Sequence, residues 1–563
     1  MRLTPEQFAV VESEGDVYVR ACPGAGKTRT LVELAKRFTT RAPRRGVAFL
    51  SFTNAAGAEV RQRLTSDAPH LLRAPSYVGT FDSFLIRYVL GPDGLSTAPN
   101  ARVQFCETWN DTVGLKSVSA GFPLDLFVPD GVGGLKLDDA RADHVERAVL
   151  KKLTDDQRRQ LIWVAERKLK PFLSRGVVTS PFLRAEAATR LSVAPAGLRV
   201  AHRFQLVLVD EAQDCDSVDL QIVSALRGAG CRLVVVADPE QGIFRFRGAD
   251  PLAIGTLGLA ELALTGNFRS TASICAASAS LRAHELPPDT PQGEPRPEHP
   301  VQLLVYETSV GAEVGAQFSE LLKRHKVDRA NAIVVAHRDE DARRAVGAER
   351  AHDSTARGAV LARAVSPAAS ADDRAAGVQR IEEVLLSSLG EVAPGEPAAR
   401  WCRVTARQIL GTVAAGDATR GVCARARDAL SSLSPPESTA FVENPRKLFN
   451  AKEPKGDLSR ARMSVELRFS TAHGVKGREF DAVLVVVPNS TRLGELLSAW
   501  RDREHGHDGR AVLYVAATRA RTLLAFAVPR HAASDVAGLL TRRGARVEQI
   551  VCSAVSTRED TRR

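Results

Sequence analysis

Short runs of consecutive apolar residues recur along the chain, each bounded by polar or turn-forming residues. Runs that are apolar at every position are typical of parallel strands buried on both faces of a sheet. They form two groups, from Val17 to Phe268 and from Val301 to Pro529. We therefore predict an α/β protein with two parallel-sheet domains. The predicted strands lie in the runs VYVRA, GVAFLSF, FQLVLVDE, RLVVVAD, VQLLVYE, NAIVVAH, DAVLVVVP, AVLYVAATRA and LLAFAVP.

Each group is interrupted by a long segment that lacks such runs. The first segment, from about Leu90 to Arg199, contains the charged stretch DQRRQLIWVAERKLKPFL. The second, from about Arg343 to Met463, is rich in Ala and Arg. Because Ala, Arg, Leu and Glu favour helix, we expect each sheet domain to carry a mainly helical insertion.

Charge and cysteine content indicate the kind of partner and the compartment that we expect for this protein. The chain has 77 Lys and Arg against 66 Asp and Glu, a net charge of +11, which favours a polyanionic partner such as nucleic acid. Its eight cysteines include no CxxC pair, so neither a zinc ribbon nor a disulfide framework is indicated. The start, MRLTPEQFAVV, lacks the continuous apolar core of a signal peptide, and no apolar run approaches the roughly 18 residues of a membrane span. We expect a soluble protein of the reducing cytoplasm.

The first apolar run leads into a phosphate-binding loop. Residues 21–28 read A-x-x-x-x-G-K-T, the P-loop pattern with alanine in place of its first glycine. Glycines let backbone N–H groups approach phosphates, Lys27 reaches the β and γ phosphates, and Thr28 can bind Mg²⁺. The alternative is a chance strand-turn-helix. The predicted loop comprises Ala21, Cys22, Pro23, Gly24, Ala25, Gly26, Lys27 and Thr28.

Such a loop requires a second, acidic site. The run LVLVDEAQD ends a predicted buried strand with Asp210 and Glu211. This order places a metal-binding carboxylate and a candidate general base at the C-terminal edge of a parallel sheet, where ligands of α/β proteins bind. Two acids at this position are also compatible with an ordinary helix N-terminus. Together with Lys27 and Thr28, they predict an ATP and Mg²⁺ site.

Eight ordered motifs extend this pattern: LTPEQ, SFTNAAGAEVRQRL, VGTFDSF, DEAQD, VVVADPEQGIFRFRGA, NFRST, TAHGVKGREFD and LYVAATRA. Together with the P-loop, the series resembles superfamily 1 helicases of the UvrD/Rep/PcrA type over residues 3–520. The resemblance implies two RecA-like domains with ATP between them and an accessory domain in each insert. The first RecA-like domain would comprise 1–90 and 200–265, the second 266–343 and 463–563, and the inserts 91–199 and a reduced 344–462.

The resemblance also implies residues around the base and ribose. Gln7 would read adenine, Arg29 would lie near the base, and Phe268 would stack on it where the family usually has Tyr. A phenyl ring keeps the stacking face and loses only the hydroxyl. Glu479 would bind the ribose, with Gly477 in the same motif.

A further set of residues would act at the γ-phosphate. Gln241 would sense it, and Arg269 and Arg519 would be arginine fingers reaching across from the second sheet domain. Surface ion pairs are the alternative for a lone arginine. The predicted catalytic set is Lys27, Asp210, Glu211, Gln241, Arg269 and Arg519.

The same motifs imply a nucleic-acid track of aromatic faces and polar groups. Phe52 and Phe81 could instead be core residues behind the strands. The family commonly has Lys at Ala55, His at Asp82, Tyr at Phe244 and Trp at Phe246, and these departures remove polar contacts. The predicted contacts are Phe52, Thr53, Asn54, Thr80, Phe81, Phe244, Phe246, Arg247 and His473.

Three functions stay open. The first is an ATP-dependent translocase or helicase on single-stranded DNA, with 3′ to 5′ polarity implied only by the family. The second follows a resemblance to the compact helicase-like subunit of Gabija-type anti-phage systems, in which a DNA-sensing ATPase works with a partner nuclease. The third is an ATP-gated binding switch that does not translocate. Repair and defence roles are both open, and RNA is a possible track.

Overall fold

A computed structural model provides the fold. It describes residues 3–41, 44–99, 101–106, 108–109, 122–142, 144–245, 248–283, 289–348, 361, 364–365, 371–389, 397–415, 422–436, 440–445 and 467–552. The chain divides into two compact units. Unit 1 comprises Met1–Phe84, Leu191–Glu349 and Val465–Arg563, and unit 2 comprises Leu85–Arg190 and Arg350–Ser464. Both large sheets belong to unit 1.

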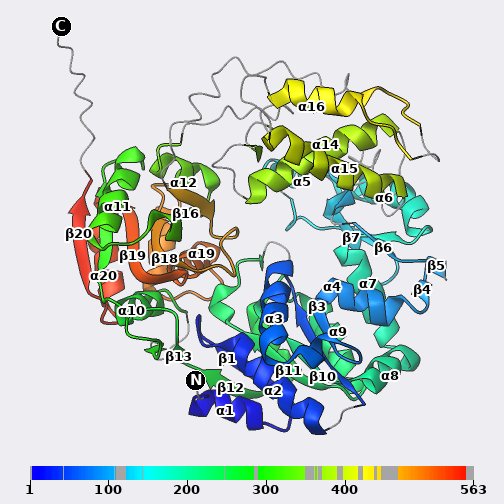
Figure 1. Cartoon of the computed structure of the whole chain (residues 1–563), viewed down its shortest axis with the longest axis horizontal. Helices are drawn as coiled ribbons and strands as arrows, with labels where there is room; N and C mark the ends of the chain where they lie inside the picture. The colour runs from blue at the N-terminus through cyan, green and yellow to red at the C-terminus, as the bar shows by residue number, and fades with distance from the viewer. Residues whose placement is uncertain are drawn as a thin grey trace. The chain divides into compact units, whose positions relative to one another are not determined.

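The first sheet has six strands in the order β12-β1-β11-β10-β2-β3, and every neighbouring pair is parallel. Its strands are β1 (Val17–Ala21), β2 (Gly46–Ser51), β3 (Tyr77–Thr80), β10 (Phe204–Val209), β11 (Arg232–Ala237) and β12 (Ala260–Leu264). The blue β1 lies between the green β11 and β12 in Figure 1. Segments more than 200 residues apart therefore build one sheet.

Helices accompany this sheet, and all except the first, which precedes β1, lie in the connections between its strands. They are α1 (Pro5–Glu12), α2 (Lys27–Arg41), α3 (Asn54–Asp67), α4 (Phe81–Phe84), α8 (Ala194–Arg203) and α9 (Ser217–Gly228). The N-terminus of α1 is fixed by a capping box, in which Thr4 and Gln7 exchange hydrogen bonds between side chain and backbone. This cap places the Gln7 side chain beside the loop that follows β1.

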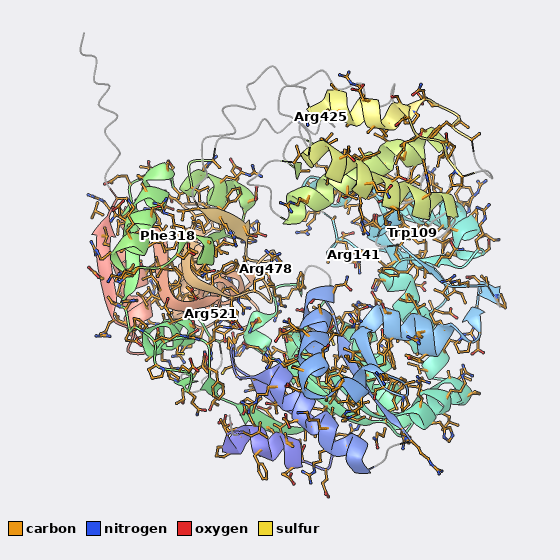
Figure 2. All side chains as sticks on the ribbon, in the orientation of Figure 1. Trp109, Arg141, Phe318, Arg425, Arg478 and Arg521 are labelled. Carbon is orange, nitrogen blue, oxygen red and sulfur yellow. The ribbon has the colours of Figure 1, made fainter. Side chains whose placement is uncertain are left out.

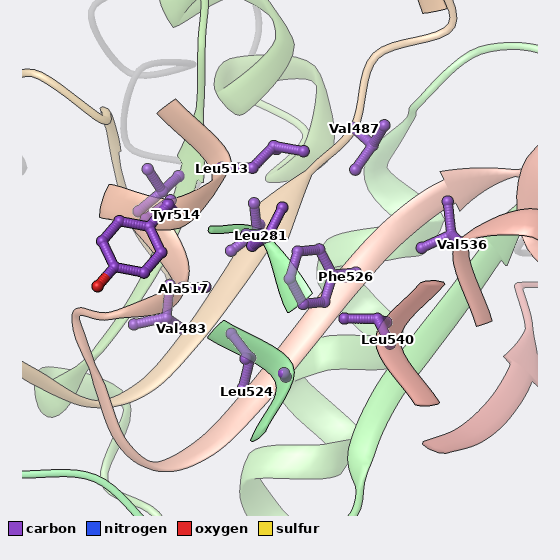
Figure 3. Packing of buried hydrophobic residues seen from close by; sticks show 14 of the residues in the cluster. Leu281, Val483, Val487, Leu513, Tyr514, Ala517, Leu524, Phe526, Val536 and Leu540 are labelled. Carbon is purple, nitrogen blue, oxygen red and sulfur yellow. The ribbon is translucent and has the colours of Figure 1, made fainter. Parts of the chain in front are cut away.

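The second sheet also has six parallel strands, in the order β17-β16-β18-β19-β15-β20. They are β15 (Val301–Tyr306), β16 (Ala332–Ala336), β17 (Arg468–Thr471), β18 (Phe480–Val486), β19 (Ala520–Pro529) and β20 (Val547–Val551). Alternate residues of each central strand enter two separate cores. Val335 lies in one apolar cluster and its neighbour Val334 in the other. Figure 3 shows part of the first cluster, around Phe526.

Helices of this second half are α10 (Ala272–Ser280), α11 (Ala312–Arg324), α12 (Asp339–Ala345), α18 (Leu493–Arg501), α19 (Asp508–Ala517) and α20 (Ala533–Thr541). A two-residue ladder joins β13 (Gly266–Asn267) to β14 (Thr290–Pro291). This ladder lies at the connection between the two sheets.

Eight of the nine predicted strands are confirmed, but the prediction of a strand at Ala511–Ala520 is wrong. Residues 508–517 form helix α19 instead. The His507 side chain caps its N-terminus by accepting from Arg510 N at 3.3 Å. Every residue from Arg510 to Ala517 is buried, and a helix that is apolar all round has the same sequence pattern as a buried strand.

Unit 2 is mainly helical, and the predicted inserts fall largely within it. Its helices are α5 (His144–Leu150), α6 (Asp155–Leu173), α7 (Ser180–Leu191), α14 (Ala371–Leu389), α15 (Pro397–Ala415) and α16 (Val422–Ser431). Short strands accompany them, namely β4 (Gly94–Leu95), β5 (Ala98–Pro99), β6 (Gln104–Phe105), β7 (Phe127–Pro129), β8 (Leu135–Leu137) and β9 (Val177–Val178). Trp109, labelled in Figure 2, is buried and packs edge-on against Phe182.

None of the helices in the described part of the chain combines the length and apolar character that a membrane span needs.

Candidate nucleotide-binding site

The loop between β1 and α2 closes around two glycines in the left-handed region. Gly24 has φ +73° and Gly26 has φ +74°, a backbone that other residues rarely adopt. A Cβ on Gly24 would lie 2.6 Å from the Arg269 Cβ, and one on Gly26 would lie 2.9 Å from Gln7 Nε2. Helix α2 begins at Lys27, so its N-terminus and the preceding loop form an anion-binding geometry.

Lys27 faces the acidic end of β10. Its Nζ lies 3.4 Å from Glu211 Oε1, and the Glu211 N–H donates to Asp210 Oδ1 at 2.9 Å. Glu211 adopts φ 57°, which is uncommon for a non-glycine residue and often accompanies a functional position. The predicted phosphate-binding lysine, base and metal ligand are therefore adjacent.

The pKa values of the two carboxylates are shifted in opposite directions. Burial and the neighbouring Glu211 raise the pKa of Asp210 to about 7. Burial also acts on Glu211, but Lys27 and Lys476 outweigh it and lower its pKa to about 2. Burial acts to lower the pKa of Lys27, yet Glu211 and Asp210 more than compensate and raise it.

These charges fit a divalent cation. The Asp210 carboxylate is buried, the Glu211 carboxylate beside it is partly buried, and Lys27 is the cation that contacts Glu211. Oxygen ligands of this kind are those that Mg²⁺ prefers. Thr28, the next residue of α2, has the hydroxyl for the same ion.

A second group of contacts joins the two sheets. Arg519, next to the N-terminus of β19, donates from Nη2 to Gln241 Oε1 at 3.0 Å. Both side chains are about 3 % exposed. Burial, and to a smaller extent Arg269, lower the pKa of Arg519 to about 10. The predicted sensor and one predicted arginine finger are thus in direct contact.

The other predicted finger is held by the predicted ribose ligand. Arg269 donates from Nε to Glu479 Oε1 at 2.7 Å and from Nη1 to Thr518 O at 3.0 Å. Arg521, labelled in Figure 2, donates to Glu479 Oε2 from Nη2 at 3.0 Å and from Nε at 3.2 Å. Burial opposes them, but these two arginines lower the pKa of Glu479.

Two of the predicted base-binding residues, Gln7 and Phe268, contact the loop directly. Gln7 is buried, donates from Nε2 to Ala25 O at 3.0 Å and accepts from Thr4 N at 3.2 Å. Phe268 N donates to Gly24 O at 2.9 Å. Gly477 has φ +80°, and Arg29 lies in the first turn of α2. Adenine recognition by Gln7 stays a prediction, because protein groups engage both ends of its amide.

Sequence analysis missed the partners that hold the two sheets together. Lys476 donates from Nζ to Asp214 Oδ1 and Oδ2 at 2.6 and 2.7 Å, and to Gln241 O at 3.2 Å. Tyr514 donates to Asp238 Oδ2 at 3.1 Å. All of these residues lie inside the quoted motifs, so motif membership was a signal, but the pairing between motifs was not readable.

Comparison with known proteins agrees with this geometry. Residues 3–94 and 185–257 match the UvrD/REP helicase N-terminal domain, and residues 432–527 match the viral superfamily 1 RNA helicase core domain. Over these residues the chain is similar to superfamily 1 helicases of the UvrD type.

The individual relatives are distant. ATP-dependent DNA helicase UvrD1 of Mycobacterium leprae is 26% identical over 312 residues, which cover 50% of this chain and 40% of the relative. ATP-dependent DNA helicase PcrA of Leuconostoc citreum is 26% identical over 49% of this chain and 38% of the relative. ATP-dependent DNA helicase Rep of Escherichia coli is 28% identical over 25% of this chain and 20% of the relative. The match to the first two therefore spans about two fifths of their lengths.

The first of the predicted nucleic-acid contacts lie at the ends of β2 and β3. The Phe52 and Phe81 rings stack with centroids 5.2 Å apart. Phe81 is only 1 % exposed, so in this structure it is a core residue, the alternative that its sequence left open. Thr53 caps α3 by accepting from Ala56 N, and its neighbour Asn54 is exposed. Thr80 donates to Ser83 Oγ at 2.8 Å.

A second group lies where the sheets meet. The Phe244 ring is half-buried. Its centroid lies 5.6 Å from the centroid of the His473 ring and 4.8 Å from Lys476 Nζ. A hydrogen bond of 3.1 Å joins His473 Nε2 and Ile243 O. Phe246 and Arg247 lie outside the described residues. The structure therefore brings together Phe244 and His473, and separately Phe52 and Phe81.

Proposed function

We propose that this chain hydrolyses ATP between its two RecA-like sheets and uses that cycle to move along single-stranded DNA, with 3′ to 5′ polarity. One observation carries the proposal. Glu211 of the first sheet pairs with Lys27 and also interacts electrostatically with Arg519 of the second sheet, which donates to Gln241. A hydrolysis site that needs residues from both sheets couples chemistry to their relative movement.

In this proposal, Lys27 and the N–H groups of the loop bind the β and γ phosphates. Glu211 accepts a proton from the attacking water, for which its low pKa keeps it ionised. Arg519 and Arg269 neutralise charge that develops on the γ-phosphate. Thr28 and Asp210 would hold Mg²⁺, which would supply positive charge to the phosphates.

The contact between Arg269 and Glu479 makes nucleotide binding precede the movement of Arg269 toward the γ-phosphate. While Glu479 holds Arg269, the finger is directed at a carboxylate instead of a phosphate. A ribose that binds Glu479 competes for the same oxygens. Nucleotide arrival therefore releases Arg269 toward the γ-phosphate.

Phe244 and His473 support the nucleic-acid part of the proposal. They lie next to Lys476, whose partners are Asp214 and the Gln241 backbone. A base that stacks on Phe244 therefore disturbs groups that contact the hydrolysis site. This adjacency provides a direct route from strand binding to ATP turnover.

The deciding experiment measures ATP turnover by the purified chain with and without single-stranded DNA. We expect DNA to stimulate turnover and Glu211→Gln to reduce it by about 10²- to 10⁴-fold, because the general base is lost. Glu320→Gln is the matched control, since Glu320 is an exposed carboxylate that pairs only with Lys323 among the described residues. It should behave as the wild type.

Little turnover by the wild type with or without DNA, despite ATP binding, would refute the self-sufficient motor. It would favour a subunit that needs a partner, such as the nuclease of an anti-phage complex. A matched RNA strand belongs in the same assay, because residues 432–527 match an RNA helicase domain. Stimulation by RNA but not by DNA would reassign the track. Strand displacement on a 3′-tailed and a 5′-tailed duplex then tests polarity.

A further inference from the structure

Tyr514 is a buried tyrosine whose hydroxyl leaves the apolar core. It belongs to α19, is 0 % exposed, and packs in the cluster that contains Leu281 and Phe526. In Figure 3 its ring lies at the margin of this cluster and its oxygen points away from the labelled apolar side chains. The hydroxyl donates to Asp238 Oδ2 at 3.1 Å. A group from the second sheet domain thus reaches a carboxylate that follows β11 of the first.

Asp238 receives several hydrogen bonds. Its Oδ2 also accepts from Gln241 Nε2 at 2.8 Å, and its Oδ1 accepts from Glu240 N at 3.2 Å. Its own N–H donates to Gln213 Oε1 at 3.2 Å. The residue is 5 % exposed, so water supplies little competition for these positions. Asp238 therefore fixes the direction of the Gln241 amide nitrogen.

The orientation of a glutamine amide is set by its partners, because the oxygen and the nitrogen occupy equivalent positions and differ only in accepting or donating. Gln241 has Asp238 at its nitrogen and Arg519 at its oxygen. Tyr514 and Arg519 are five residues apart, at the C-terminal end of α19 and just beyond it. One short segment of the second sheet domain thus supplies two contacts to the sensor region of the first.

We propose that Tyr514 is a positioning residue for hydrolysis. Its hydroxyl holds Asp238, and Asp238 holds the Gln241 side chain in the orientation that hydrolysis needs. Separation of the sheets removes Tyr514 and Arg519 together, so Gln241 keeps Asp238 at its nitrogen but loses the partner of its oxygen and the hydroxyl that holds Asp238. The inference rests on the proposed ATPase function and names an additional residue of the same site.

The test compares Tyr514→Phe with Tyr306→Phe. Tyr306 is an equally buried tyrosine of the second sheet whose hydroxyl donates to Val487 O at 2.8 Å, away from the sensor. Both variants lose one buried hydrogen bond. We expect Tyr514→Phe to lower kcat for DNA-stimulated ATP turnover by about tenfold, the effect of losing one hydrogen bond to a charged acceptor. KM for ATP should stay within about twofold of the wild type. Tyr306→Phe should leave both constants unchanged.

A double-mutant cycle separates positioning from a structural role. If Tyr514 acts through Gln241, Tyr514→Phe should have no further effect on kcat in a Gln241→Ala background. An equal loss in that background overturns the inference, and so does an active wild type whose kcat Tyr514→Phe leaves unchanged. A thermal midpoint well below that of Tyr306→Phe would assign the hydroxyl a structural role and overturn it as well. A wild type without turnover would instead overturn the proposed function, and the inference with it.

Discussion

The nucleotide site and the predicted nucleic-acid track of unit 1 are built in opposite ways. At the nucleotide site, charged side chains are buried or partly buried and several have a defined partner, as in Lys27 with Glu211 and Arg519 with Gln241. Along the track, Asn54 and Thr53 are exposed, and the aromatic rings contact each other or lie half-buried. The first region is preorganised by the protein and the second presents open surface.

This difference matches the demands of the two tasks. Transition-state charge is stabilised most by groups that are already oriented in a dry site. A track must release each nucleotide after every step, and single-strand binding relies on stacking that tolerates any base. We therefore expect substitutions at the nucleotide site to change rate far more than binding, and substitutions along the track to change binding or local stability.

The largest expected effect is at Arg519. Arg519→Ala should reduce DNA-stimulated ATP turnover by about 10³-fold or more, because an arginine finger is lost. Binding of a fluorescent ATP analogue should change far less. Arg530→Ala is the control, since Arg530 is an exposed arginine paired with Glu307. A fall in turnover of less than about tenfold would remove Arg519 from the finger role.

The buried ion pair between Lys476 and Asp214 should contribute more to stability than an exposed ion pair does. Asp214→Asn leaves the Lys476 charge buried without its counter-ion, so we expect the free energy of unfolding to fall by about 3 kcal/mol. Urea denaturation measures this. Glu320→Gln, which breaks the exposed pair with Lys323, should leave the urea midpoint unchanged. Equal midpoints for the two variants would contradict the burial argument.

Phe244 and Phe81 should respond differently. Phe244→Ala should weaken single-stranded DNA binding by about 5- to 100-fold, because one stacking face is lost. Phe81→Ala removes a buried ring and should lower the free energy of unfolding by about 3–5 kcal/mol. Its DNA affinity, measured by fluorescence anisotropy where it is folded, should match the wild type. The reverse pattern would make Phe81 the track residue.

The smallest expected effect is at Thr53. Thr53→Ala removes the N-cap of α3 and should cost about 1 kcal/mol of stability, whereas Thr53→Ser keeps the cap. Thermal melts measure the difference. If Thr53 also binds phosphate, the alanine variant alone weakens DNA binding. Equal melting of both variants would show that the cap contributes nothing.

The strands show where sequence is sufficient. All eight confirmed strands occupy the central positions of the two sheets, whereas β12, β3, β17 and β20, which form the edges, were not predicted. A central strand is buried on both faces and must be apolar throughout. An edge strand is partly exposed, as the mainly exposed β12 and β20 illustrate, so its sequence resembles that of a loop.

Helix α19 shows where the pattern fails. Its residues are buried on every side, so an uninterrupted apolar run is required of it whether it forms a helix or a strand. This wrong prediction concerns the proposed site, because α19 carries Tyr514 and ends just before Arg519. The direction in which the hydroxyl points follows from the helix and cannot be read from the run.

By itself, the sequence determined the eight central strands, the loop after β1 and the acidic pair after β10, because each depends on residues close together in the chain. Tertiary structure alone decided which motifs touch. Tyr514 and Asp238 are 276 residues apart, and Lys476 and Asp214 are 262 residues apart. No local preference links such residues. Their contact arises when two separately formed sheets bury facing polar groups, which then need partners because water is excluded.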